Sequence, residues 1–229
     1  MKVIIKYFLT LSLLTYIAGC DDNNYMHQKY LDQGETLYMG KADSVKFSAG
    51  NERVKFTWIL NADPRIDRCV FYWNDGKDSA VVRTNRSQSG MLNMEAILDV
   101  EEGIYTFRLV TKDDNNNMSL AVERTVQVYG PTYISRLVNR NMSSSFANDK
   151  LTINWVIIES ALIQYSTVYY TDYSEPGNPV AKSVRVENSD TKTEISGIRE
   201  GDTFSITTSY MPEGGLDILE SSALEYTIK

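Results

Sequence analysis

Short apolar and aromatic runs alternate with turn residues along most of the chain. After residue 25, no stretch has the apolar spacing of an amphipathic helix. Runs rich in Val, Ile, Thr, Tyr and Phe recur instead, which is typical of an all-β sandwich. In the first half, strands are predicted at Ser44–Phe47, Arg53–Ile59, Arg68–Trp73, Ser79–Arg83, Met91–Leu98, Gly103–Thr111 and Ala121–Val128. In the second half, they are predicted at Ile134–Arg140, Lys150–Val156, Ser166–Tyr170, Lys182–Val186, Lys192–Ile195, Thr203–Tyr210 and Glu225–Ile228.

Three segments between these runs carry clear turn chemistry. Asn74-Asp75-Gly76 consists of residues that accept the positive φ of a tight hairpin. Pro176-Gly177-Asn178-Pro179 cannot continue a hydrogen-bonded ladder, because proline has no amide hydrogen to donate. Tyr129-Gly130-Pro131-Thr132 combines a strand-ending Gly with a stiffening Pro, so we expect a short linker with limited hinge freedom there.

The two halves of the chain repeat each other. Trp58 and Trp155 lie 97 residues apart, and so do the aromatic pairs Tyr72-Trp73 and Tyr169-Tyr170. An acidic residue followed by Gly recurs at a similar offset, as Glu102-Gly103 and Glu200-Gly201. A constant period of about 100 residues predicts two copies of one sandwich. The predicted segments are a signal peptide at residues 1–19, a tether at 20–40, a first sandwich at 41–130 and a second sandwich at 131–229.

The same residues resemble fibronectin type III domains. A strand-B Trp, an aromatic pair at the end of strand C and an acidic-Gly turn before the aromatic strand F all match that family's pattern. The resemblance implies two tandem immunoglobulin-like sandwiches with the tryptophans in their cores. The order of motifs is also similar to a Bacteroides-type family of surface lipoproteins of unassigned activity. That second resemblance covers residues 25–145.

The N-terminus resembles the lipobox of bacterial lipoproteins. Lys2 and Lys6 precede an apolar stretch of 11 residues, Tyr7–Ile17, which is shorter than the ~20 residues of a membrane-spanning helix. Ala18-Gly19-Cys20 then places small residues directly before a Cys. The resemblance implies cleavage before Cys20 and lipidation of its sulfur, so the predicted partner is a membrane. The alternative is an ordinary secretory signal peptide or a short membrane anchor.

The residues after Cys20 bear on which face of the membrane the protein occupies. Asp21-Asp22-Asn23-Asn24 resembles the export signal of surface lipoproteins in the Bacteroides group. It predicts an outer-membrane lipoprotein that faces outward, with a solvated tether and periplasmic retention as the alternative.

Charge and composition exclude several kinds of function. The net charge of −7 argues against a nucleic-acid partner, because phosphate binding needs a basic surface. The chain's one His is His27, in the predicted tether, so no Ser or Cys is expected to have an imidazole base nearby. Cys69 lies in an apolar run and is expected to be a buried core residue. We therefore expect no enzyme activity.

No cofactor or metal is expected either. The loop Asp113–Asn117 alternates oxygen-bearing side chains as calcium loops do. However, Met118 stands where such a loop has Gly, and Arg124 stands where it has Glu, so a solvated hairpin is favoured. A glycosidase needs two carboxylates that face each other across a cleft, and a small sandwich offers no deep cleft. The carboxylates weighed for this role all lie in predicted loops: Asp63, Asp67, Asp75, Asp78, Asp99, Glu101 and Glu102.

Tyrosines are the candidate binding residues. Strand alternation places Cys69, Phe71 and Trp73 on one face of their strand and Tyr72 on the other. The resemblance to fibronectin type III domains implies that the first set faces inward, which leaves Tyr72 and Tyr169 on outer sheet faces. Exposed aromatic rings stack on the apolar faces of sugars, so a glycan ligand is predicted. The candidate residues are Tyr72, Tyr169, Tyr170 and Tyr173. The alternative is that these tyrosines fill the cores.

These observations predict a lipid-anchored, non-enzymatic binding or spacer protein of the cell envelope. Glycan capture in a polysaccharide-utilisation system is the first hypothesis. The alternative is an adhesin or assembly component that binds a surface protein through its sheet edges.

Overall fold

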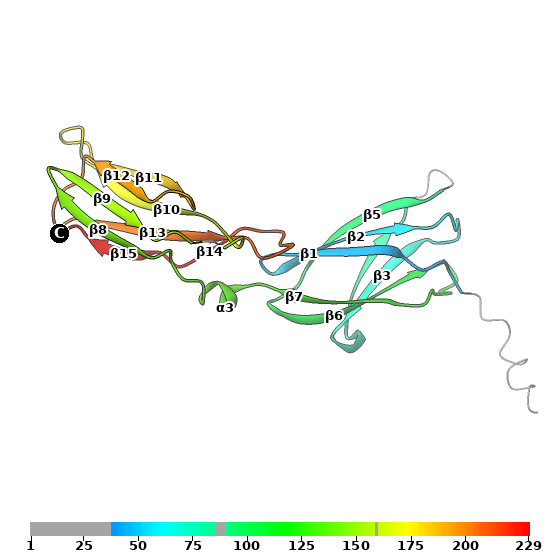
Figure 1. Ribbon diagram of the computed structural model, residues 1–229. Coiled ribbons are helices and arrows are strands. Elements are labelled where there is room, and N and C mark those ends of the chain that lie inside the picture. The colour runs from blue at the N-terminus through cyan, green and yellow to red at the C-terminus, as the bar shows by residue number, and fades with distance from the viewer. Residues whose placement is uncertain (1–37, 86–89, 159) are drawn as a thin grey trace, which may run out of the picture. The chain divides into compact units, whose positions relative to one another are not determined.

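The first sandwich consists of two antiparallel sheets that share one core. The computed structural model describes residues 38–85, 90–158 and 160–229 (Figure 1). One sheet has the order β1-β2-β5, and the other has the order β4-β3-β6-β7. The bounds are β1 Asp43–Ala49, β2 Arg53–Leu60, β3 Arg68–Trp73, β4 Asp78–Arg83, β5 Leu92–Asp99, β6 Gly103–Lys112 and β7 Val122–Val128. The predicted signal peptide, Cys20 and His27 lie outside the described residues.

The second sandwich repeats this arrangement. Its first sheet has the order β8-β9-β12, and its second has the order β11-β10-β13, with β14 and β15 both paired to β13. The bounds are β8 Met142–Ala147, β9 Lys150–Trp155, β10 Ile163–Asp172, β11 Val180–Glu187, β12 Lys192–Ser196, β13 Thr203–Tyr210, β14 Leu219–Glu220 and β15 Leu224–Thr227. The fold is all-β, with two fibronectin type III-like sandwiches, as the sequence predicted.

Each core forms where the inward-facing residues of the two sheets meet. Trp58 of β2 packs edge-on against Phe71 of β3, with ring centroids 5.3 Å apart. Trp155 of β9 lies in the second core, and its indole nitrogen donates to Thr193 at 2.9 Å. Cys69 is fully buried in the first core, as predicted. Because successive side chains of a strand point to opposite faces, the residues between these core positions form the outer faces of the sheets.

The hairpin turns have the predicted backbone. Asn74, Asp75 and Gly76 all have positive φ, and they form a short 3₁₀ turn between β3 and β4. Gly177 has a φ of 78° in the loop between β10 and β11. In the loop after β6, Asn116 takes the left-handed conformation that Gly would normally supply.

The predicted strand Ile134–Arg140 is wrong. The segment begins instead with a helical turn, α3 (Pro131–Ile134), and extended pairing starts only at Met142. The carboxylate of Glu102, in the turn before β6, accepts the backbone amides of Thr132 and Tyr133, each at 2.7 Å. These two bonds satisfy amides at the helix N-terminus that would otherwise lack partners. Together with the Pro at the start of α3, they favour a helical turn over a strand.

Arg140 is a buried cation that the sequence reading did not identify. Its side chain is 1% exposed, and its guanidinium donates to the backbone carbonyls of Val156, Glu187, Asn188 and Asp190 at 2.8–3.0 Å. The same group lies over the Trp155 ring, 5.3 Å from its centroid. Burial lowers the pKa of this guanidinium. Arg140 thereby ties together the segment after β9 and the loop after β11.

Within the described residues, no helix has the length and apolar character needed to span a membrane.

Candidate functional site

The outer face of the β11-β10-β13-β15 sheet carries a shallow hollow of about 370 Å³. Tyr169 of β10 stands in it with 39% of its surface exposed. Strand pairing places Ser183 on one side of Tyr169 and Ser205 on the other, and Ser205 lies opposite Glu225 of β15. The neighbouring outward positions are Thr171, Ala181 and Thr203. An exposed ring is thus surrounded by small and hydroxyl-bearing side chains.

The charges beside this hollow are largely compensated. Lys182, which also lines the hollow, donates to the carboxylate of Asp172. This bond and a second one from Ser174 lower the pKa of Asp172 to about 2. The pair therefore contributes no net charge near neutral pH, and Glu225 leaves the hollow slightly acidic. Such a surface favours an uncharged polar ligand over an anion.

The structure separates the other two candidate tyrosines of the second sandwich. Tyr170 lines the same hollow, but its side chain packs against the core on the inner side of the sheet. Tyr173 follows the end of β10, where the guanidinium of Arg199 lies 3.9 Å from the centroid of its ring. Of these three tyrosines, Tyr169 is therefore the one best placed to contact a ligand.

Tyr72 occupies the equivalent position in the first sandwich, and its surroundings differ. It lies on the outer face of β3, directly opposite Arg108 of β6. Lys112 donates to its hydroxyl at 2.9 Å, and the Lys112 ammonium is 5.4 Å from the ring centroid. The ring is half-buried and has cations as neighbours. The structure therefore does not bring Tyr72 together with the other candidates.

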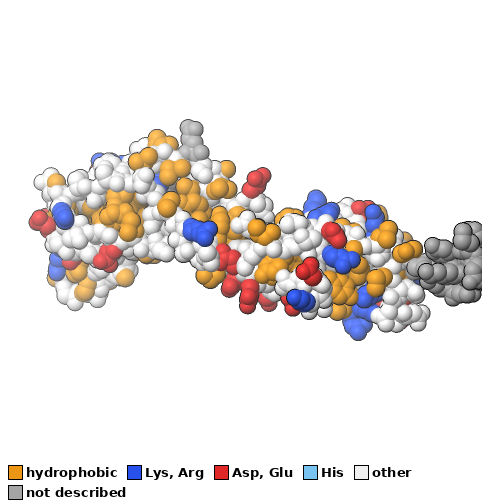
Figure 2. Space-filling view, turned by 90° about the horizontal axis from the view of Figure 1, so that it is seen from below, with side chains coloured by type: hydrophobic (Ala, Val, Ile, Leu, Met, Phe, Trp, Pro, Cys, Tyr) orange, Lys and Arg blue, Asp and Glu red, His pale blue; other side chains and the backbone are white. Residues whose placement is uncertain are grey.

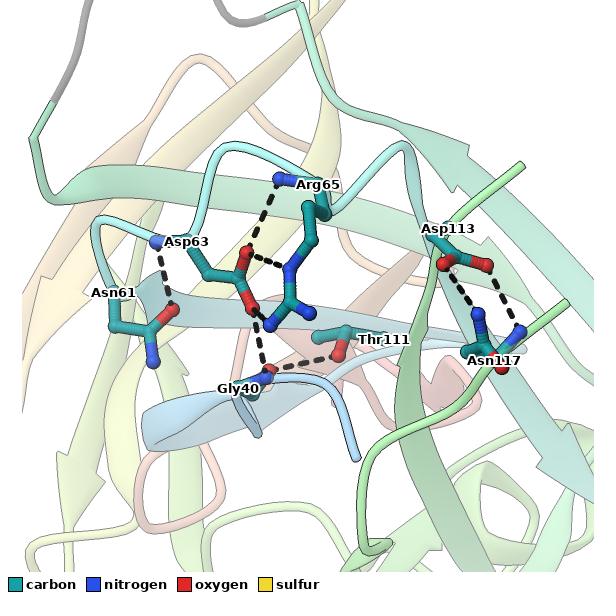
Figure 3. A network of polar contacts seen from close by, with 7 residues as sticks. All are labelled: Gly40, Asn61, Asp63, Arg65, Thr111, Asp113 and Asn117. Carbon is teal, nitrogen blue, oxygen red and sulfur yellow. Dashed lines mark hydrogen bonds and ion pairs between the residues drawn. The ribbon is translucent and has the colours of Figure 1, made fainter. Parts of the chain in front are cut away.

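A polar network fixes the start of the first sandwich (Figure 3). The carboxylate of Asp63 accepts the backbone amide of Gly40 at 3.3 Å and two guanidinium hydrogen bonds from Arg65 at 2.9 Å. These contacts lower the pKa of Asp63 to about 2, with the Arg65 side chain the main cause. The hydroxyl of Thr111 donates to the Gly40 carbonyl at 2.7 Å. Ordered structure therefore includes Met39 and Gly40, which the sequence placed in the tether.

The loop Asp113–Asn117 is closed by its own hydrogen bonds. The two carboxylate oxygens of Asp113 accept the backbone amide of Asn117 at 2.9 Å and its side-chain amide at 2.7 Å (Figure 3). The hydrogen bonds from Asn117 lower the pKa of Asp113. The carboxylate is thus used to shape the turn. In the parts of the chain that the structure describes, no three His, Cys, Asp or Glu side chains are grouped as a metal site.

Comparison with known proteins places the chain in a family. A family model, DUF4998, described as a domain of unknown function, matches residues 20–218. The chain belongs to the DUF4998 family. No curated protein matches this DUF4998 chain. The family assignment therefore brings no established activity with it.

Solved structures similar to this DUF4998 chain include three proteins from chicken. The FN1–FN3 domains of CNTN1 match 85% of this chain and 68% of their own, with 11% identity and a TM-score of 0.37. A two-domain fibronectin type III segment of tenascin matches 82% and 99%, with 17% identity and a TM-score of 0.32. The interferon gamma receptor alpha chain matches 82% and 98%, with 14% identity and a TM-score of 0.33. The fold assignment here rests on the chain's own strand order.

Sequence reasoning missed most neighbours of Tyr169. Ser183, Ser205 and Glu225 come from three different strands, and strand register alone places them beside the ring. The sequence did contain one signal, because the predicted strand Thr203–Tyr210 is rich in Ser and Thr. Hydroxyl side chains at alternate positions of such a strand share one sheet face.

Proposed function

We propose that this DUF4998 protein is a non-catalytic, lipid-anchored binding protein of the cell envelope whose second sandwich captures a glycan. The exposed ring of Tyr169, set among hydroxyl side chains in a shallow hollow, is the observation that carries the proposal. The glycan lies against the outer face of β10, β11 and β13. This role fits a polysaccharide-utilisation system, in which surface proteins hold the polymer near the cell.

The chemistry of the hollow matches that of a neutral sugar. A pyranose has an apolar face of C–H groups, which stacks on an aromatic ring, and hydroxyl groups at its rim. Here Tyr169 offers the ring, while Ser183, Ser205 and Glu225 offer hydrogen-bonding partners around it. The open shape of the hollow admits a segment of a long chain as well as its end.

Replacing Tyr169 with Ala is expected to remove the binding of neutral polysaccharide. Affinity gel electrophoresis in pullulan, laminarin, xylan or mannan is the measurement, with the native protein retarded by at least one of them. Loss of the stacking ring should weaken that retardation about tenfold or more, because aromatic stacking supplies the main apolar contact.

Tyr72→Ala is the matched control, since it removes an equivalent outer-face tyrosine from the first sandwich. It should leave retardation by the neutral polymer unchanged. Equal retardation of the Tyr169→Ala and native proteins would refute glycan capture at this hollow. Binding of a protein with no retention by any polysaccharide would favour the adhesin alternative.

The membrane anchor is tested separately. The proposed anchor is a lipid on Cys20, and the small residues Ala18-Gly19 directly before it support cleavage at this point. Cys20→Ala is expected to move the protein from the detergent phase to the aqueous phase in Triton X-114 partitioning, because no acyl chains remain to bury. Protease treatment of intact cells tests the outward orientation that Asp21-Asp22 suggests. A native N-terminus without acyl chains in mass spectrometry would contradict the anchor.

A further inference from the structure

The outer face of the β4-β3-β6-β7 sheet carries cations in register. Arg68 of β3 is paired with Arg83 of β4 on one side and with Lys112 of β6 on the other. Adjacent strands are about 4.8 Å apart, so these three cations form one row across the sheet. On the face drawn in Figure 2, several Lys and Arg side chains gather over the first sandwich. Like charges directly opposite each other destabilise a sheet unless something compensates them.

Compensation within the sandwich is incomplete. Asp67 is shared between Arg68, at 2.9 Å, and Arg83, at 3.3 Å. Lys112 contacts the neutral hydroxyl of Tyr72. Arg108, in register with Tyr72 on the other side of a row of valines, pairs with Glu123 at 3.3 Å, and both side chains are well exposed. Among the described residues, two carboxylates thus pair with three of these four cations, although the protein as a whole carries a charge of −7. Arg68 also donates to the side-chain oxygen of Asn116 at 2.6 Å.

An apolar row runs beside the cationic one. Val70 of β3 pairs with Val81 of β4 and with Val110 of β6. Val70 and Val110 are only 4% and 5% exposed, so they lie below the level of the charged side chains, whereas Val81, on the edge strand β4, is 57% exposed. The face therefore has a row of cations next to a row of valines, and the Tyr72 ring lies on the other side of the valine row.

We propose that this face binds an acidic polysaccharide whose carboxylate groups contact Arg83, Arg68 and Lys112. A linear polyuronate presents negative charges at intervals along its length and C–H faces between them, which matches a cationic row beside a row of valines. Binding would relieve the repulsion within the row. The proposal does not depend on the hollow around Tyr169, which has a different charge.

A lipid surface and a protein partner fit this face less well than an acidic polysaccharide. Peripheral attachment to a lipid surface uses several apolar side chains that insert below the headgroups. Of the three valines in this row, Val81 alone is exposed, and Val70 and Val110 are sunk into the sheet. A protein interface has a well-packed apolar centre, often with a free aromatic anchor, whereas Tyr72 is already held by Lys112. The two sandwiches thus present equivalent tyrosines in different settings, cationic at Tyr72 and hydroxyl-rich at Tyr169.

The test is affinity gel electrophoresis of the full chain in polygalacturonate at low salt. The native protein should be retarded, and the double variant Arg83→Gln with Lys112→Gln should bind about tenfold more weakly, because two ionic contacts are removed. Asp67→Asn should bind about threefold more tightly, because it frees two cations from their shared carboxylate. Retardation should fade as salt is raised, through screening.

The matched control is Lys150→Gln with Lys192→Gln, which removes two charges that pair with Glu194 on the second sandwich. It should bind polygalacturonate as the native protein does, and so should Tyr169→Ala. Equal weakening by the control, absence of native retardation, or binding to phosphatidylglycerol vesicles but not to polygalacturonate would each overturn the proposal. Misfolding of the double variant would also weaken binding, but it does not predict tighter binding by Asp67→Asn. The expected gain in affinity of Asp67→Asn therefore separates the two explanations.

Discussion

Replacing Arg140 with Met is expected to unfold the second sandwich while leaving the first intact. The guanidinium satisfies four partly buried backbone carbonyls at once, and Met offers none of them a donor. Each orphaned carbonyl costs about 1–3 kcal/mol when water cannot reach it. Allowing for partial hydration of the loops after relaxation, the loss should be about 3–5 kcal/mol, a large part of the stability of a small domain.

Hydrogen exchange read by peptide mass spectrometry is the appropriate measurement, because it reports on each sandwich separately. Protection should fall in β9, β12 and β13 and persist in β2 and β6. Arg185→Met is the control: this Arg also stacks on an aromatic ring, that of Tyr165, but its side chain is exposed. Full protection of the second sandwich in the Arg140→Met variant would contradict this prediction, because it would show that the sandwich is stable without the hydrogen bonds from Arg140.

Trp58→Ala should destabilise the first sandwich by about 3–5 kcal/mol, the range found for large aromatic truncations in cores. Trp58 is almost fully buried, and it contacts the Phe71 ring across the two sheets. Truncation leaves a cavity that the rigid strands on either side cannot fill. Chemical denaturation followed by circular dichroism should show a lower midpoint for this sandwich.

Conservative substitutions then separate packing from hydrogen bonding. No described residue accepts the Trp58 indole N–H, whereas the Trp155 N–H donates to Thr193. Trp58→Phe should therefore cost less than Trp155→Phe, because only the second loses a buried hydrogen bond. An unchanged midpoint for Trp58→Ala would mean that this Trp is not part of a tightly packed core.

Most strands could be predicted from the sequence because their inward residues are large and regularly spaced. Arg68–Trp73 and Thr203–Tyr210 were predicted with the bounds they have in the structure. The repeat of Trp58 and Trp155 also reflects a real constraint, since each is a core residue of its sandwich. Period-two patterns of this kind are set by burial on one face of a strand.

Other features depended on contacts between distant residues. Strand β8 was missed because its centre is Ser143-Ser144-Ser145, and only Met142 and Phe146 reach the core. Arg140 appears in the sequence as one more surface cation, since its four acceptors are backbone groups with no sequence signature. Similarly, the setting of Tyr169 arises from strand register, which a single sequence does not specify.

The attachment of α3 has a mechanical consequence. Its first amides are held by Glu102, a residue of the first sandwich, while its own residues lie just before the second. Tension applied along the polypeptide from the second sandwich would load these two hydrogen bonds before it loaded β7, because Thr132 and Tyr133 follow β7 in the chain. Release of α3 would then lengthen the segment between β7 and β8 while the strands of both repeats stay paired.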